Sequence, residues 1–124
     1  MNGSFLQSNE WAEFQRSLGR EALEYEKYGI SAKVIRYDLP FSKNYLYIPH
    51  GPAIDFNSMT GGLKNPVANF VKWLRDEGKK RESIFVKVEP LADNVAQVLV
   101  EAGFKKSKKE IQPSRTVIID LTKS

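Results

Sequence analysis

The sequence contains no cysteine and a single histidine, His50, among its 124 residues. The lack of cysteine excludes disulfide bonds and cysteine-ligated zinc sites, and it favours a cytoplasmic protein. No apolar run approaches the roughly 20 residues that a membrane-spanning helix needs. The first residues have neither the basic start nor the apolar stretch of a secretory signal. A lone histidine without acidic neighbours does not indicate a metal site, and we expect no metal and no cofactor.

The composition fits a single soluble globular domain. Hydrophobic residues make up 41% of the chain and charged residues 27%, which suits one buried core and argues against disorder. We therefore expect residues 1–124 to form one domain. The net charge is +4, and cations cluster at 79–81 and 105–109. These clusters would attract nucleotide-sugar phosphates, anionic lipid headgroups or RNA. Alternatively they are solvated basic turns, and charge alone does not distinguish among these possibilities.

Hydrophobic periodicity predicts an α/β fold with a mixed, mostly antiparallel sheet flanked by helices. The expected order is helix, strand, strand, strand, helix, strand, helix, strand. A tight turn at Gly29 indicates a hairpin, whereas the later strands are separated by helices and indicate crossovers. This order is compatible with an acetyltransferase-like lobe. The expected helices span 9–18, 66–78 and 92–102, and the expected strands span 21–28, 31–37, 45–48, 83–88 and 116–121.

Large apolar residues recur at helical spacing in the first two expected helices. Trp11, Phe14 and Leu18 fall on one face of the first helix, and Phe70 and Trp73 lie on the apolar side of the second. We assign these faces to the core and do not interpret the aromatic residues as a ligand cage.

Four segments together match the pattern of one protein family. Segment 45–55 (Tyr-Leu-Tyr-Ile-Pro-His-Gly-Pro-Ala-Ile-Asp) is an apolar strand that runs into a proline-bearing turn. Segment 85–91 (Phe-Val-Lys-Val-Glu-Pro-Leu) is a second strand that ends at a proline. Segment 5–14 comes before both strands and includes the start of the first expected helix. Segment 103–121 contains a Gly-Phe pair, a Gln-Pro pair and a β-branched strand. In this order the chain resembles the N-terminal part of the Fem-type aminoacyltransferases, the peptidoglycan interpeptide-bridge ligases known as methicillin-resistance proteins.

The resemblance implies a longer parent protein with two acetyltransferase-like lobes. Such proteins transfer an amino acid from aminoacyl-tRNA to the stem-peptide amine of a lipid-linked or UDP-linked muramyl peptide, a step of cell-wall biogenesis that supports cell shape. It implies that this chain is a fragment, the N-terminal acceptor-binding lobe, inactive alone. Peripheral contact with a membrane surface is a further implication. The transferred amino acid, the form of the acceptor and the catalytic residues stay open.

The resemblance places acceptor-binding candidates at the first strand end. His50 would project from its turn toward a phosphate or carboxylate, and Gly51 would let backbone amides approach the ligand closely. Tyr47 shares a strand face with Tyr45 and would offer a phenol for stacking or hydrogen bonding to a nucleotide sugar. Each has a structural alternative: an exposed turn residue, a tight turn, and core packing.

Further candidates lie elsewhere in the chain. Relatives that bind the UDP-linked acceptor carry a lysine near Gln15, and the nearest cation here is Arg16, which would bind phosphate or remain solvated. Gln112 and Arg115 precede the last strand and would orient substrate or cap the sheet edge. Glu89 would accept a donor from the substrate or form an ion pair with Arg115, and the ion pair is our expectation.

Two other functions compete with this interpretation. An acetyl-CoA-dependent N-acetyltransferase shares the lobe architecture, but the glycines at 61–62 do not follow a strand closely enough to form its pyrophosphate loop. A non-enzymatic module that binds RNA or an anionic surface is the second, but Tyr25, Tyr28 and Phe41 do not lie among the basic runs.

Overall fold

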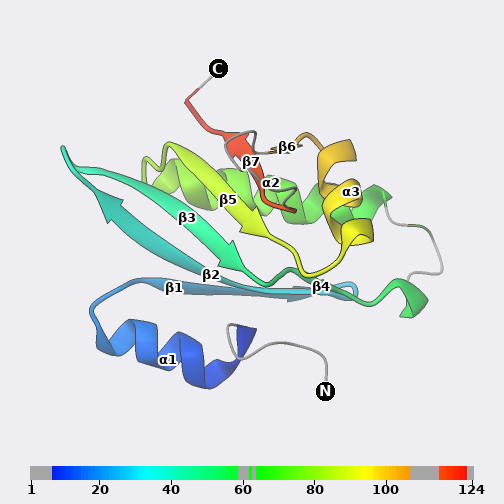
Figure 1. Cartoon of the computed structure of the whole chain (residues 1–124), viewed down its shortest axis with the longest axis horizontal. Helices are drawn as coiled ribbons and strands as arrows, with labels where there is room; N and C mark the ends of the chain where they lie inside the picture. The colour runs from blue at the N-terminus through cyan, green and yellow to red at the C-terminus, as the bar shows by residue number, and fades with distance from the viewer. Residues whose placement is uncertain (1–6, 59–61, 63, 107–114, 123–124) are drawn as a thin grey trace.

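The structure, a computed structural model, describes residues 7–58, 62, 64–106 and 115–122. A seven-stranded mixed sheet has the strand order β1-β2-β3-β5-β7-β6, and β4 pairs with β2 beside this path. Helices α2 and α3 lie on one side of the sheet and α1 on the other (Figure 1). The helical elements are α1 (Asn9–Ser17), the 3₁₀ helix η2 (Phe56–Ser58), α2 (Lys64–Lys80) and α3 (Asp93–Glu101). The strands are β1 (Ala22–Lys27), β2 (Ile30–Leu39), β3 (Lys43–Pro49), β4 (Ala53–Ile54), β5 (Phe85–Glu89), β6 (Lys105–Lys106) and β7 (Val117–Asp120).

The first three strands form an antiparallel meander. Tyr28 and Gly29 connect β1 to β2 with φ angles of 53° and 81°, as a two-residue turn matching the twist of the strands requires. Strand β3 then pairs with β5 in parallel after the crossover through α2, while β5 and β7 are antiparallel. The predicted class, a mixed and mostly antiparallel sheet flanked by helices, is confirmed.

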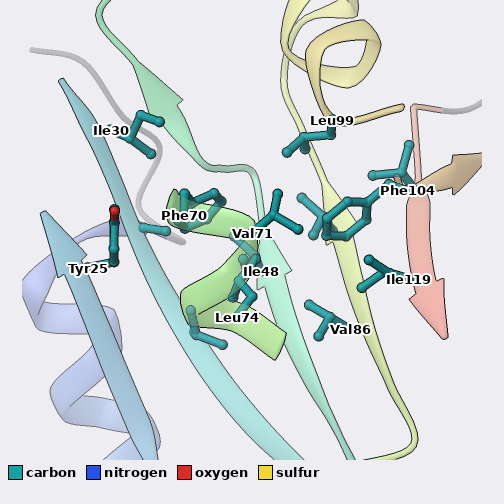
Figure 2. Close-up of a cluster of buried hydrophobic side chains, with 14 of the residues drawn as sticks. Tyr25, Ile30, Ile48, Phe70, Val71, Leu74, Val86, Leu99, Phe104 and Ile119 are labelled. Carbon is teal, nitrogen blue, oxygen red and sulfur yellow. The ribbon is translucent and has the colours of Figure 1, made fainter. Parts of the chain in front are cut away.

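The hydrophobic core lies between the sheet and the α2–α3 layer. Alternate residues of the central strands face this layer, so Leu46 and Val86 are fully buried. Figure 2 shows Phe70 and Leu74 of α2 in the same cluster as Ile48 of β3. Burial of one such side chain stabilises the fold by roughly 1.5–3 kcal/mol.

Helix α1 buries a different face from the predicted one. Phe14 and Leu18 are each 54% exposed, whereas Trp11 and Gln15 are 6% and 5% exposed. The core assignment of Phe14 and Leu18 is therefore wrong. Hydrogen bonds from the Gln7 side chain to β2 and β3 fix the start of this helix, and with it the face that meets the sheet.

The second helix and the first β3 residues also depart from the prediction. Helix α2 continues through Gly78 to Lys80. A Cβ at Gly78 would lie 2.4 Å from Leu121 Cδ1, so this glycine serves helix packing instead of ending the helix. Asn44 belongs to β3 despite its polarity, and the two-residue strands β4 and β6 were not predicted. None of the described helices combines the length and apolarity that a membrane crossing needs.

Candidate functional site

A cavity of about 950 Å³ lies beside the carboxyl ends of the parallel strands β3 and β5. Such strand ends are a common position for ligand sites in α/β proteins. Four segments line the cavity: the start of α1, the start of β2, the turn after β3 and the start of α3. Its lining includes Gln7, Ser8, Lys33, His50, Pro52, Asp55, Leu91, Ala92 and Val95.

The turn after β3 brings His50 to the cavity. His50 has a φ of 55°, the left-handed region, so the chain bends sharply where the strand ends. Gly51 is buried and follows directly, and the Gly51–Pro52 peptide is cis. A Cβ on Gly51 would lie 3.0 Å from Gln7 Cδ and 3.2 Å from Ile48 Cγ2, so a side chain does not fit without displacement. Gly51 thus permits the close packing that holds His50 at the cavity.

The Gln7 side chain fastens the N-terminal segment under this turn. Its Nε2 donates to the carbonyl oxygens of Pro49 at 2.8 Å and Lys33 at 3.2 Å. Its Oε1 accepts from the Lys33 backbone N–H at 2.6 Å. One amide therefore joins the start of α1 to both β2 and the end of β3, and it builds one wall of the cavity.

Two helix starts, those of α1 and α3, border the cavity. At α1 the Ser8 hydroxyl accepts from the Trp11 N–H at 3.1 Å, so one first-turn N–H group is already satisfied. At α3 the N-cap is Ala92, whose side chain makes no capping hydrogen bond. The first-turn N–H groups of a helix favour an anion such as phosphate or carboxylate. Together with the imidazole of His50, they make the cavity suited to an anionic ligand.

No metal centre is formed within the part of the chain that the structure describes. There, no three side chains of His, Cys, Asp or Glu gather closely enough to hold an ion.

Tyr47 lies outside the cavity, on the sheet face that also carries α1. Its hydroxyl donates to Glu89 Oε1, and burial, followed by this hydrogen bond, raises the pKa of the Tyr47 phenol. Tyr45 stacks on Phe85 at 4.8 Å between ring centroids, and Tyr37 lies 5.7 Å from both Tyr45 and Tyr47. The prediction that Tyr45 and Tyr47 share a face is confirmed. The result is a row of half-buried aromatic rings next to the cavity strands.

The two arginine candidates are engaged in ion pairs. Arg16 lies in the last turn of α1, about 10 Å along the helix from its start. Its guanidinium contacts Glu13 at 2.8 Å and Glu24 at 3.4 Å. Arg115 Nε donates to Asp93 Oδ1 at 2.7 Å, in the first turn of α3.

The expected ion pair between Arg115 and Glu89 is absent, because Asp93 binds Arg115 and Tyr47 binds Glu89. Gln112, the remaining candidate, lies outside the described residues. The structure therefore brings His50 to the cavity, with the buried Gly51 packed next to it, and leaves Arg16 and Tyr47 apart from it.

Sequence reasoning missed Gln7 and the start of α3 as parts of this site. Segment 5–14 contributes to the family pattern and to the predicted helix 9–18, but Gln7 lies before that helix begins and carries no signal of its own. Its role depends on partners 26 and 42 residues away in the chain. No local pattern could have revealed those contacts.

Comparisons with known proteins agree with this architecture. The family model described as "FemAB family" matches residues 1–123. Among solved structures, a KacTA–DNA complex is similar with a TM-score of 0.54 and 16% identity, over 81% of this chain and 65% of that chain. Tetrahymena GCN5 is similar with a TM-score of 0.53 and 14% identity, over 82% of this chain and 68% of that chain. The shared fold is an acetyltransferase-like (GNAT) lobe. A comparison with curated proteins finds no match.

Proposed function

The chain belongs to the FemAB family, and from this membership we propose that it is the acceptor-binding lobe of an aminoacyltransferase of peptidoglycan synthesis. The lobe is the N-terminal part of a larger two-lobed protein. The acceptor is a UDP-linked or lipid-linked muramyl peptide, and aminoacyl-tRNA is the donor. Both substrates place the reaction in the cytoplasm, with peripheral contact at the membrane surface when the acceptor is lipid-linked.

The reaction requires positioning more than a covalent intermediate. The neutral amine of the stem peptide attacks the ester carbonyl of aminoacyl-tRNA, an amide bond forms and the ester bond breaks. The amine loses a proton and the departing tRNA hydroxyl gains one. Correct orientation of the two substrates supplies up to roughly 7–11 kcal/mol of such a barrier. Holding the acceptor is therefore a substantial share of catalysis, and groups outside this chain complete it.

The observation that carries the proposal is the cavity at the family's own strand-and-turn motif. His50 and the uncapped start of α3 offer donors to an anion, and the cavity of about 950 Å³ has room for a sugar phosphate or a peptide carboxylate. We assign His50 and the backbone around Gly51 to this contact. Tyr47 and Arg16 lie further along the same side of the sheet and would meet more distant parts of the acceptor.

The test is an amide NMR titration of the chain with UDP-muramyl-pentapeptide, with UDP alone as control. We expect shifts concentrated at 49–55 and 91–95, larger with the pentapeptide than with UDP. His50→Ala should weaken binding about fivefold or more, since it removes the imidazole N–H that would donate to the anion. Gln97→Ala, at an exposed position of α3 away from the cavity, should leave binding unchanged. Dispersed peaks that do not move with either ligand would refute the acceptor assignment.

The fold is also compatible with one alternative function, which the same experiment tests. The GNAT-like lobe is shared with Tetrahymena GCN5, so acetyl-CoA is included as a third ligand. Shifts with acetyl-CoA and none with the pentapeptide would identify an acetyl-CoA-dependent enzyme instead.

A further inference from the structure

A second hollow lies between α2 and α3. It has a volume of about 660 Å³, and its floor consists of small apolar side chains, among them Val67, Val71, Val98 and Ala102. Ala68 lines one wall and is exposed. Val67 and Val71 are only 4% and 5% exposed, and Val98 and Ala102 are partly exposed, so the apolar floor is recessed between the two helices.

Cationic side chains line the α2 side of the groove. Lys64, Lys72, Arg75 and Lys79 follow each other at intervals of whole helical turns, so they form one stripe. Asp76 neutralises Lys72 at 2.9 Å, but within the described residues the other three form no ion pair. The pKa of the exposed Asp76 carboxyl is lowered by Lys72 first, and Lys79 and Lys80 contribute to the same shift. The groove therefore carries an excess of positive charge.

Arg75 is positioned where α2 and α3 approach each other. Its Nη2 atom would lie 3.3 Å from a Cβ on Gly103, the residue that follows the end of α3. The guanidinium therefore lies across the end of the groove, within reach of a ligand held between the helices. A planar guanidinium binds carboxylates in a bidentate manner, which suits an acidic partner.

We propose that this groove binds an acidic amphipathic helix of a partner protein. Small recessed side chains between two helices accept the larger apolar side chains of a third helix, the helix-in-groove mode. Glutamate or aspartate beside those apolar residues would pair with Lys64, Arg75 and Lys79. The volume, the apolar floor and the cationic rim all match this one occupant.

The same features favour a helix over a membrane or RNA. Membrane-binding surfaces project large apolar side chains into the lipid, whereas here the apolar atoms are valine and alanine at the bottom of a groove. Single-stranded RNA is bound through aromatic side chains on which its bases stack, and none of the described residues that line this groove is aromatic.

The test uses a labelled synthetic helix with leucine at every third or fourth position and glutamate between them. A peptide of the same composition in scrambled order is the control. Fluorescence anisotropy with the 124-residue chain gives the affinities, and amide NMR shifts give the location. We expect only the patterned helix to bind, with shifts confined to 64–79 and 98–103.

A matched pair of variants tests the location independently. Ala68→Glu adds a carboxylate to the groove wall and should weaken binding about tenfold or more, because like charges are then opposed. Asn69→Glu adds the same charge to the next residue of the same helix, which is exposed and does not line the groove, and should change affinity less than about twofold.

Several outcomes would overturn the proposal. Equal binding of the scrambled peptide would show that charge alone drives the contact. Binding of a single-stranded RNA or of phosphatidylglycerol vesicles that Ala68→Glu abolishes, without binding of the helix, would assign the groove to that ligand. Equal effects of the two variants would place the contact elsewhere. The acceptor titration at the other cavity does not depend on any of these results.

Discussion

Single polar side chains hold the segments of this lobe together at positions beyond the reach of strand pairing. Beyond the last β2–β3 pair, Gln7 supplies three hydrogen bonds to the backbone of Lys33 and Pro49. At the other end of β3, the buried Asn44 donates to the Arg81 carbonyl at 2.9 Å and accepts from the Ser83 hydroxyl. Since a buried unpaired polar group costs about 1–3 kcal/mol, each amide is costly to replace.

We expect Gln7→Ala to lower the free energy of unfolding by about 2–3 kcal/mol, because it leaves backbone groups of Lys33 and Pro49 unpaired. Urea unfolding followed by circular dichroism measures this change. Gln97→Ala, on the exposed face of α3, should cost less than about 0.5 kcal/mol. Equal costs for the two variants would mean that Gln7 does not fasten the N-terminal segment.

An ion-pair network around Arg81 predicts how stability depends on pH. Arg81 contacts Glu21 and Glu77 at 2.7 Å each. The hydrogen bond from Arg81 lowers the pKa of Glu21 below its ordinary 4.5. Burial acts to raise the pKa of Glu77, but its hydrogen bonds with Arg81 and Lys80 outweigh burial and the net shift is downward. Both carboxyls thus stabilise the fold above about pH 4.5, and this contribution is lost as the pH falls.

We therefore expect Arg81→Gln to flatten the pH dependence of stability. Between about pH 6 and pH 3 the unmodified chain should lose more free energy of unfolding than the variant, by about 1 kcal/mol for these partly exposed pairs. Urea unfolding at each pH gives both values. Lys27→Gln, on an exposed part of β1, should retain the original slope. A slope in Arg81→Gln that matches the unmodified chain would contradict the assignment.

Helices and strands were predictable wherever their signals are local. The hairpin at Gly29, the three helices and the final strand follow from turn residues and apolar periodicity. The core assignment of Phe14 and Leu18 was wrong because the rotation of a short helix about its axis depends on distant contacts, here those of Gln7. The predicted helix end at Gly78 was wrong because, in the sequence, a glycine required by packing cannot be distinguished from one that ends a helix.

The candidate site was predictable only in part, for the same reason. The turn that carries His50 is visible in the sequence, because proline and glycine mark the end of β3. The segments that complete the cavity come from three other elements, and their meeting depends on sheet topology. Arg16 and Arg115 looked available because the sequence does not reveal their more distant partners, Glu24 and Asp93.

The packing of α2 against the end of β7 gives a prediction about Gly78. Gly78→Ala should destabilise the fold by about 1–3 kcal/mol, because the new Cβ meets Leu121 Cδ1 at 2.4 Å. In a Leu121→Ala background the same substitution should become neutral or stabilise by up to about 1 kcal/mol, since alanine is the better helix former. Chemical denaturation of the four proteins of this double-mutant cycle measures the coupling. Additive effects would show that the contact does not limit packing.

At the scale of the whole molecule, the two faces of the sheet are covered unequally. Helices α2 and α3 cover one face and share an apolar cluster with it, whereas among the described helices only α1 lies on the other (Figure 1). The row of Tyr37, Tyr45 and Tyr47 remains half-buried on that second face. The lobe is nonetheless one structural unit, because both helix layers pack on the same strands.

The two tryptophans report on these two layers separately. Trp11 lies in α1, and Trp73 lies in α2 against Tyr25. We expect Trp11→Phe and Trp73→Phe, each with one tryptophan left, to unfold in single transitions whose fluorescence and circular dichroism midpoints coincide. An earlier fluorescence transition in Trp73→Phe than in Trp11→Phe would indicate that the α1 layer melts by itself.

The position of β7 has a consequence for the order of events during synthesis. This strand comes last among the described elements, yet it pairs with β5 on one side and β6 on the other. While the chain is being made, the meander β1–β3 can form from neighbouring residues, but β5 keeps an open edge until β7 arrives. Exposed edges of this kind recruit other chains. Until β7 is available, the partly folded chain would therefore be prone to aggregation through the open edge of β5. We expect chaperones to be needed most during this stage of synthesis.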